Sequence, residues 1–157
     1  KNSTQKRRIM QVNISTFLPI APEKLIEELK SPKQLQKTAA PLVYFDYCGE
    51  GELSEKWQPR AYLFSVRLFG FLPFGKHTMV FTYPDSLSIR DNGYSGLCKK
   101  WDHLMTVRAS AGGCIYTDCA QIEAGILTPV LWLFGQAMYR FRQRSWRKYV
   151  ATLETND

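Results

Sequence analysis

The chain has 157 residues, of which 45% are hydrophobic and 13% aromatic, and its formal net charge is +7. This length suits one domain and this apolar content suits a packed core, which excludes disordered, collagenous and repeat architectures. The opening residues, KNSTQKRR, are polar and basic and lack the apolar run of a signal peptide. The sequence therefore predicts a basic tail over 1–8, a single domain over 9–151 and a second tail over 152–157.

Neither a membrane anchor nor a metal site is expected. The longest apolar run, 125–139, is interrupted twice and is shorter than the roughly 20 residues of a membrane-spanning helix. The four cysteines are isolated, without a C-x-x-C pair, and His77 and His103 have no ligand-like neighbours. The pattern predicts buried free thiols, no metal, no cofactor and a cytoplasmic protein.

The amino-terminal region predicts one strand followed by two short helices. Apolar residues alternate from Ile9 to Phe17, as they do in a half-buried strand. Pro22 fits the first position of a helix of about two turns. Ser31 can cap a second helix that begins at Pro32, and this helix should end before Pro41.

The middle of the chain predicts an antiparallel sheet. Alternating segments are found at 42–48, 61–69, 78–83, 87–90, 96–108 and 114–122. Glycine and proline in GFLPFG, residues 70–75, predict a corner, and Pro84-Asp85 predicts a turn. Asp91-Asn92-Gly93 predicts a tight hairpin, because Asn and Gly accept positive φ at little cost.

A single long helix is predicted from Pro129, capped by Thr128, to about Ala151. Its length of about 33 Å would cross a small domain. The first half is apolar almost all round, so we expect it to be enclosed on most faces. Gly135 indicates either a close approach by another backbone or space left for a ligand.

The second half of this helix is basic. Its cations are Arg140, Arg142, Arg144, Arg147 and Lys148. One interpretation is a solvated helix end whose cations suit the negative pole of the helix dipole. The other is a binding surface for nucleic acid or an anionic membrane.

Three segments of the chain resemble a known superfamily. They are FLPIAPEKLIEELKSPKQLQKTAAPLVYF, LFGFLPFGKH, and the stretch from RDNGYSGLCKKWDHL to the basic helix. They are similar to the START-like, or SRPBCC, superfamily, in particular to its branch of small bacterial proteins. The resemblance implies an α+β helix-grip fold, in which a curved antiparallel sheet of about six or seven strands accompanies two short helices. One long carboxy-terminal helix would cross the concave face of that sheet.

Candidate site residues follow from the two-residue period of the strands. Trp101 and His103 share the more apolar face of their strand, so both should point inward. Across the next hairpin Tyr116 and Asp118 share a face, and Asp118 should lie opposite or diagonal to His103. This pair is either a satisfied structural contact or a polar handle for a ligand.

The first functional hypothesis is binding or transport of a small hydrophobic or amphipathic molecule between sheet and helix. The residues expected to bind it are Tyr62, Phe64, Trp101, His103, Tyr116, Asp118, Phe134 and Met138. Their bulk predicts a small pocket. Two alternatives remain open: a cyclase or dehydratase that uses His103 and Asp118 as acid and base, and a module that docks on RNA, ribosome or membrane. The sequence favours binding over catalysis and does not specify an oligomeric state.

Overall fold

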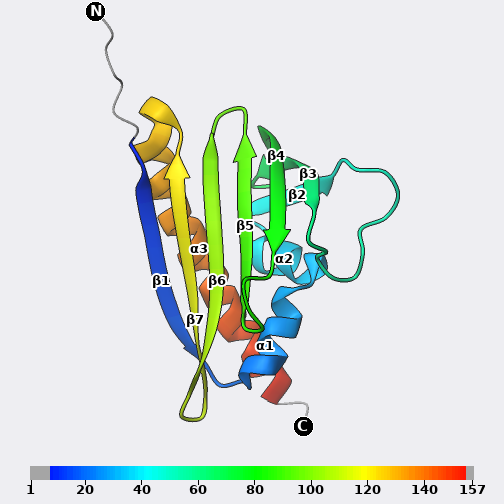
Figure 1. The fold of residues 1–157 in the computed structure, drawn as a ribbon, viewed down its shortest axis with the longest axis vertical. Helices are drawn as coiled ribbons and strands as arrows, with labels where there is room; N and C mark the ends of the chain where they lie inside the picture. The colour runs from blue at the N-terminus through cyan, green and yellow to red at the C-terminus, as the bar shows by residue number, and fades with distance from the viewer. Residues whose placement is uncertain (1–7, 155–157) are drawn as a thin grey trace, which may run out of the picture.

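The computed structural model of the chain describes residues 8–154, which form a seven-stranded antiparallel sheet with three α-helices on one face (Figure 1). The strands are β1 (Met10–Leu18), β2 (Val43–Tyr47), β3 (Ala61–Leu68), β4 (Leu72–Thr82), β5 (Ser88–Ser95), β6 (Lys100–Ser110) and β7 (Gly113–Glu123). The helices are α1 (Pro22–Leu29), α2 (Pro32–Ala39) and α3 (Thr128–Glu154), and a short 3-10 turn, η1 (Gly125–Leu127), precedes α3.

The order of strands across the sheet is β1-β7-β6-β5-β4-β3-β2, and every neighbouring pair is antiparallel. Helix α3 runs along the sheet behind β1, β7 and β6, while α1 and α2 cover the same face beside it (Figure 1). The expected α+β helix-grip architecture is therefore confirmed.

The amino-terminal signals act as predicted. Pro22 is the first residue of α1, and Pro32 is the first residue of α2. The Ser31 hydroxyl accepts a hydrogen bond from the Gln34 backbone N–H at 3.4 Å, which caps α2. Helix α2 ends at Ala39, before Pro41.

Helix α3 buries one stripe of side chains against the sheet. Leu131, Gly135, Met138, Arg142 and Trp146 recur at intervals of three and four residues and are all buried. Glu154 ends the helix, three residues beyond the predicted end at Ala151. Of the predicted tails, residues 1–7 and 155–157 lie outside the described residues, whereas residues 152–154 belong to α3.

The expectation that the first half of α3 is enclosed was wrong. Val130 and Leu133 are each 61% exposed, and Ile126 in η1 is 83% exposed. Because the sheet covers only one side of this helix, the opposite side has no layer to bury it. Although the first half of α3 is apolar on all sides, only the side that faces the sheet is buried.

The predicted hairpin at Asp91-Asn92-Gly93 was also wrong, because all three residues lie inside β5. A Cβ at Gly93 would lie 2.6 Å from His77 Nε2 and 2.9 Å from the Thr78 carbonyl oxygen. Gly93 is thus required by the close approach of β4 rather than by positive φ. The chain turns after β5, where the Ser95 N–H donates to the Cys98 carbonyl at 2.7 Å.

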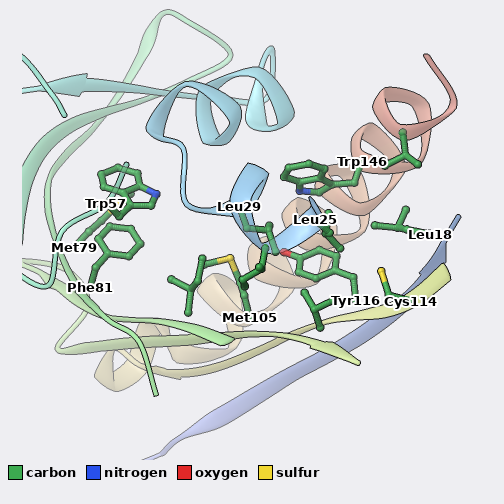
Figure 2. Close-up of a cluster of buried hydrophobic side chains, with 14 of the residues drawn as sticks. Leu18, Leu25, Leu29, Trp57, Met79, Phe81, Met105, Cys114, Tyr116 and Trp146 are labelled. Atoms are coloured by element: carbon green, nitrogen blue, oxygen red, sulfur yellow. The ribbon is translucent and has the colours of Figure 1, made fainter. Parts of the chain in front are cut away.

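The core contains two clusters of buried side chains, one on each half of the space between sheet and helices. Figure 2 shows the first, with Trp57 stacked on Phe81 and with Trp146 of α3 near Tyr116. The Trp57 and Phe81 rings are 4.1 Å apart at 13°. Burying each large apolar side chain stabilises the fold by about 1.5–3 kcal/mol.

The four cysteines are free thiols. Cys98 and Cys114 are buried and Cys119 is half-buried, but Cys48 is exposed. The expected burial therefore fails at Cys48, which directly follows β2 at the edge of the sheet.

Candidate functional site

A cavity of about 90 Å³ lies between the inner face of the sheet and helix α3. Most of its lining is apolar or aromatic, and its polar members are His77, Asp91, His103 and Arg142. The apolar and aromatic members are Leu29, Leu35, Val43, Phe45, Trp57, Val66, Phe74, Met79, Phe81, Trp101, Met105, Phe134, Met138, Tyr139 and Trp146. Several of them appear in Figure 2, where Met105 lies between Phe81 and Tyr116.

Four of the predicted ligand-binding residues line this cavity, namely Trp101, His103, Phe134 and Met138. The Trp101 indole N–H donates to the Tyr139 hydroxyl at 2.8 Å, which fastens β6 to α3. The Trp101 and Phe134 rings meet edge to face, 6.4 Å apart. As predicted, Trp101 and His103 face the helix.

Tyr62 and Phe64 lie elsewhere, in the aromatic cluster around Trp57. The Tyr62 hydroxyl accepts a hydrogen bond from the Gln58 backbone N–H at 2.8 Å. Phe64 lines a second hollow of about 310 Å³ between α2 and the segment 53–57. None of the polar residues of the first cavity lines this hollow. Neither residue is among those that line the first cavity.

Tyr116 and Asp118 lie behind His103 rather than on the cavity wall. His103 pairs with Ala120 in the β6–β7 register and Asp118 pairs with Met105, so the two side chains are diagonal neighbours, as predicted. The distance from His103 Nε2 to Asp118 Oδ1 is 2.7 Å. Oδ1 also accepts from the Tyr116 hydroxyl at 2.6 Å, and Oδ2 accepts from Gln143 Nε2 at 3.0 Å.

Burial and hydrogen bonding set the charges of this network. Burial lowers the pKa of His103, so its imidazole is neutral near pH 7 and Nε2–H donates to Asp118. Burial alone would raise the pKa of Asp118, but the interaction with His103, the charge of the Arg142 guanidinium and the hydrogen bond from Tyr116 hold it below the ordinary value. Burial also raises the pKa of Tyr116 well above its usual range. The network is therefore an ionised carboxylate that accepts hydrogen bonds from neutral donors and is stabilised through space by the Arg142 charge.

This arrangement limits acid–base chemistry. Asp118 has both oxygens occupied and does not line the cavity, so His103 is the member of the pair that a bound molecule would contact. The cyclase or dehydratase hypothesis stays a prediction that depends on His103 alone.

Three polar residues of the cavity were not identified from the sequence. Asp91 on β5 accepts a hydrogen bond from the Val80 N–H at 2.8 Å, and burial raises its pKa to about 7. Burial lowers the pKa of His77 on β4 to about 4, so this ring is neutral. The third is Arg142 of α3.

The prediction that Arg142 belongs to a basic surface was wrong, because this residue is only 5% exposed. The reason is its place in the buried stripe of α3, four residues after Met138 and four before Trp146. That spacing is visible in the sequence and could have identified it. Arg140, Arg144, Arg147 and Lys148 are exposed, and a nucleic-acid or membrane role for them stays a prediction.

Within residues 8–154, no group of three or more His, Cys, Asp or Glu side chains is placed to hold a metal ion. In the same part of the chain, no helix is long and apolar enough to cross a membrane.

Solved structures with the same fold are numerous, although their sequences differ greatly from this one. A START superfamily protein from Mycobacterium smegmatis is 10% identical, with a TM-score of 0.64, over 91% of this chain and 98% of that chain. A protein from Chromobacterium violaceum is 15% identical, with a TM-score of 0.66, over 89% of this chain and 96% of that one.

The di-domain aromatase/cyclase StfQ of the steffimycin biosynthetic pathway is 9% identical, with a TM-score of 0.67, over 96% of this chain and 53% of StfQ. No protein-family model and no curated protein matches the chain by sequence. At such low identity these likenesses establish the architecture rather than an activity. The chain has the START-like, or SRPBCC, helix-grip fold.

Proposed function

We propose that the protein binds a small hydrophobic or amphipathic molecule in the cavity between the sheet and α3. The observation that carries this proposal is the cavity itself, whose wall is largely apolar and whose few polar groups converge from β4, β5, β6 and α3. Binding sites for small molecules have this composition, because apolar contacts supply affinity and a few polar groups set orientation.

The size of the cavity supports a ligand of modest dimensions. If it were dry, about 90 Å³ of empty space would cost about 2 kcal/mol, at roughly 24 cal/mol per Å³. A stable domain tolerates that cost. An apolar molecule that fills the space restores the lost contacts and would bind in preference to water.

The surroundings of the cavity also favour an apolar ligand. The rings of Phe74 and Phe134 stack 6.1 Å apart at its edge, and both residues are half-buried. Exposed apolar side chains adjoin this pair along the chain, including Phe71 and Leu72 on one side and Leu133 on the other. An apolar molecule approaching Phe74 and Phe134 would therefore meet a compatible surface.

Native mass spectrometry of the protein incubated with a lipid extract tests the proposal. We expect a bound species of defined mass on the unmodified protein. Val66→Phe places a larger ring on the cavity wall and should reduce the bound fraction at least about tenfold.

Val130→Phe is the matched control, since it makes the same chemical change on the exposed side of α3. It should leave the bound fraction unchanged. Circular dichroism should show that both proteins are folded. If the folded Val66→Phe variant then binds as much ligand as the unmodified protein, the ligand does not occupy this cavity.

A further inference from the structure

Arg142 is a buried cation that has no hydrogen-bond or salt-bridge partner within residues 8–154. Its side chain lines the cavity and is 5% exposed. Among the described residues it forms no hydrogen bond or ion pair, and its buried Nε atom is unsatisfied. Because a guanidinium stays protonated in proteins and is costly to bury alone, this position calls for an acceptor that the chain does not supply.

A second unsatisfied donor lies one helical turn away. The indole Nε1 of Trp146 is buried and has no hydrogen-bond partner within residues 8–154. Trp146 follows Arg142 by four residues on the same stripe of α3, and both line the cavity. Arg142 and Trp146 thus both line the hollow, and each carries a buried donor that has no acceptor within residues 8–154.

The two carboxylates near Arg142 do not fill this role. Asp118 accepts hydrogen bonds from His103, Tyr116 and Gln143 instead. Asp91 accepts a hydrogen bond from the Val80 N–H. Burial raises the pKa of Asp91 to about 7, so its carboxyl group is about half protonated near neutral pH. Both carboxylates attract the Arg142 charge through space, but neither forms a salt bridge or a hydrogen bond with it, so the guanidinium N–H groups remain available to a bound anion.

We propose that Arg142 anchors the acidic group of the ligand, so that the cavity binds a carboxylic acid with an apolar body. This inference rests on the proposed function and names the ligand class for the same site. A guanidinium matches a planar carboxylate through two parallel N–H donors. A phosphate fits less well, because it is bulkier and carries about two negative charges against one buried cation.

The rest of the wall defines the body of the acid. Trp101, Phe134 and Met138 present apolar and aromatic surface on the amino-terminal side of Arg142 along α3 and β6. The acidic group would lie at Arg142, and the apolar body would extend toward Phe134. This polarity distinguishes an acid from a neutral apolar molecule of the same shape.

Calorimetric titration with two matched pairs tests the inference: butyrate against butanol, and benzoate against benzyl alcohol. Within each pair the apolar body is the same and only the head group differs. On the unmodified protein we expect at least one acid to bind about tenfold or more tighter than its alcohol, as expected for charge-assisted hydrogen bonds. Arg142→Met should abolish that preference while leaving alcohol binding within about threefold.

Arg144→Gln is the matched control, because Arg144 is exposed on the same helix and should keep the preference intact. If each alcohol binds as tightly as its acid, or if Arg142→Met keeps the preference, the inference is overturned while the proposed function stands. If no member of either pair binds, both are overturned. The comparison on the unmodified protein remains decisive should Arg142→Met fail to fold.

Discussion

Asp118 joins three elements at the level of single residues. Its two oxygens accept hydrogen bonds from His103 on β6, from Tyr116 on β7 and from Gln143 on α3. Gln143 also donates to the Ile14 carbonyl on β1 at 2.7 Å. A single buried carboxylate thus fixes the position of α3 over β1, β7 and β6.

Replacing Asp118 with Asn should be strongly destabilising. An Asn side chain removes the charge and turns one acceptor into a donor, which leaves at least one buried donor unsatisfied. We expect a loss of about 3 kcal/mol in the free energy of unfolding, measured by urea denaturation. Asp46→Asn is the control, because the exposed Asp46 side chain pairs with Arg67 on the neighbouring strand and its replacement should cost under about 1 kcal/mol. Equal effects of the two changes would contradict the role given to Asp118.

Asp91 should make stability depend on pH. Its folded pKa of about 7 lies above the value of about 3.9 expected in the unfolded chain. Between these values the folded state binds more protons, so this group makes the free energy of unfolding fall as pH rises from about 4 to about 7. The full loss is roughly 4 kcal/mol, at about 1.36 kcal/mol per pKa unit.

Asp91→Asn keeps an oxygen to accept from the Val80 N–H but cannot ionise. Relative to the unmodified protein, the variant should therefore gain stability as pH rises from about 4 to about 7. His77 and His103 also titrate in acid, but they contribute similarly to both proteins and cancel in the difference. A difference that does not change with pH would show that Asp91 is ionised throughout.

The sequence placed His103 and Asp118 correctly because alternation along a strand and a short hairpin fix both faces at once. It misplaced Arg142, because charge was given more weight than position on the helix. A charged residue inside a stripe of apolar residues can be turned inward by packing on either side, and composition alone does not show this.

At the level of whole elements, Gly93 and Gly135 differ in whether the neighbouring atoms can move to make room for a side chain. A Cβ at Gly93 in β5 would meet the backbone of β4, which cannot move without breaking the ladder. A Cβ at Gly135 in α3 would lie 3.1 Å from Ile122 Cδ1, at the mobile end of a side chain. Of the two explanations for Gly135, close approach is supported, although by side chains of the sheet rather than by backbone.

Gly93→Ala should cost about 1–3 kcal/mol in the free energy of unfolding, as overpacking in a core does. Gly135→Ala should remain within about 1 kcal/mol of the unmodified protein, because better helix propensity offsets the tighter contact. Thermal and urea denaturation of both variants measure this difference. A larger loss at Gly135 than at Gly93 would contradict the packing described for α3 and β5.

Most elements could be predicted because local signals agree with the tertiary structure. Proline and serine mark the starts of α1 and α2, and period-two alternation marks the strands. The failures occur where one local signal has two causes. Asp91-Asn92-Gly93 resembles a turn, but its Gly serves close strand packing and its Asp serves a buried hydrogen bond to Val80.

The whole molecule has an uneven distribution of exposed apolar side chains. Apart from Phe17, the large exposed ones lie at or near the end where β1, β4 and β6 begin and β5 and β7 finish (Figure 1). They are Ile9, Phe69, Phe71, Leu72, Tyr94, Leu97, Ile126, Leu127, Val130 and Leu133. This end adjoins Phe74 and Phe134, so the cavity and the apolar surface belong to the same end of the fold.

The proposed ligand lies between α3 and the inner face of the sheet. Intermolecular nuclear Overhauser effects from bound benzoate test this most directly, because they report short-range contacts in solution. We predict contacts to the Met138 methyl group and to the Trp101 indole, both of which line the cavity. Contacts confined to the exposed residues Ile126 and Val130 would contradict the account.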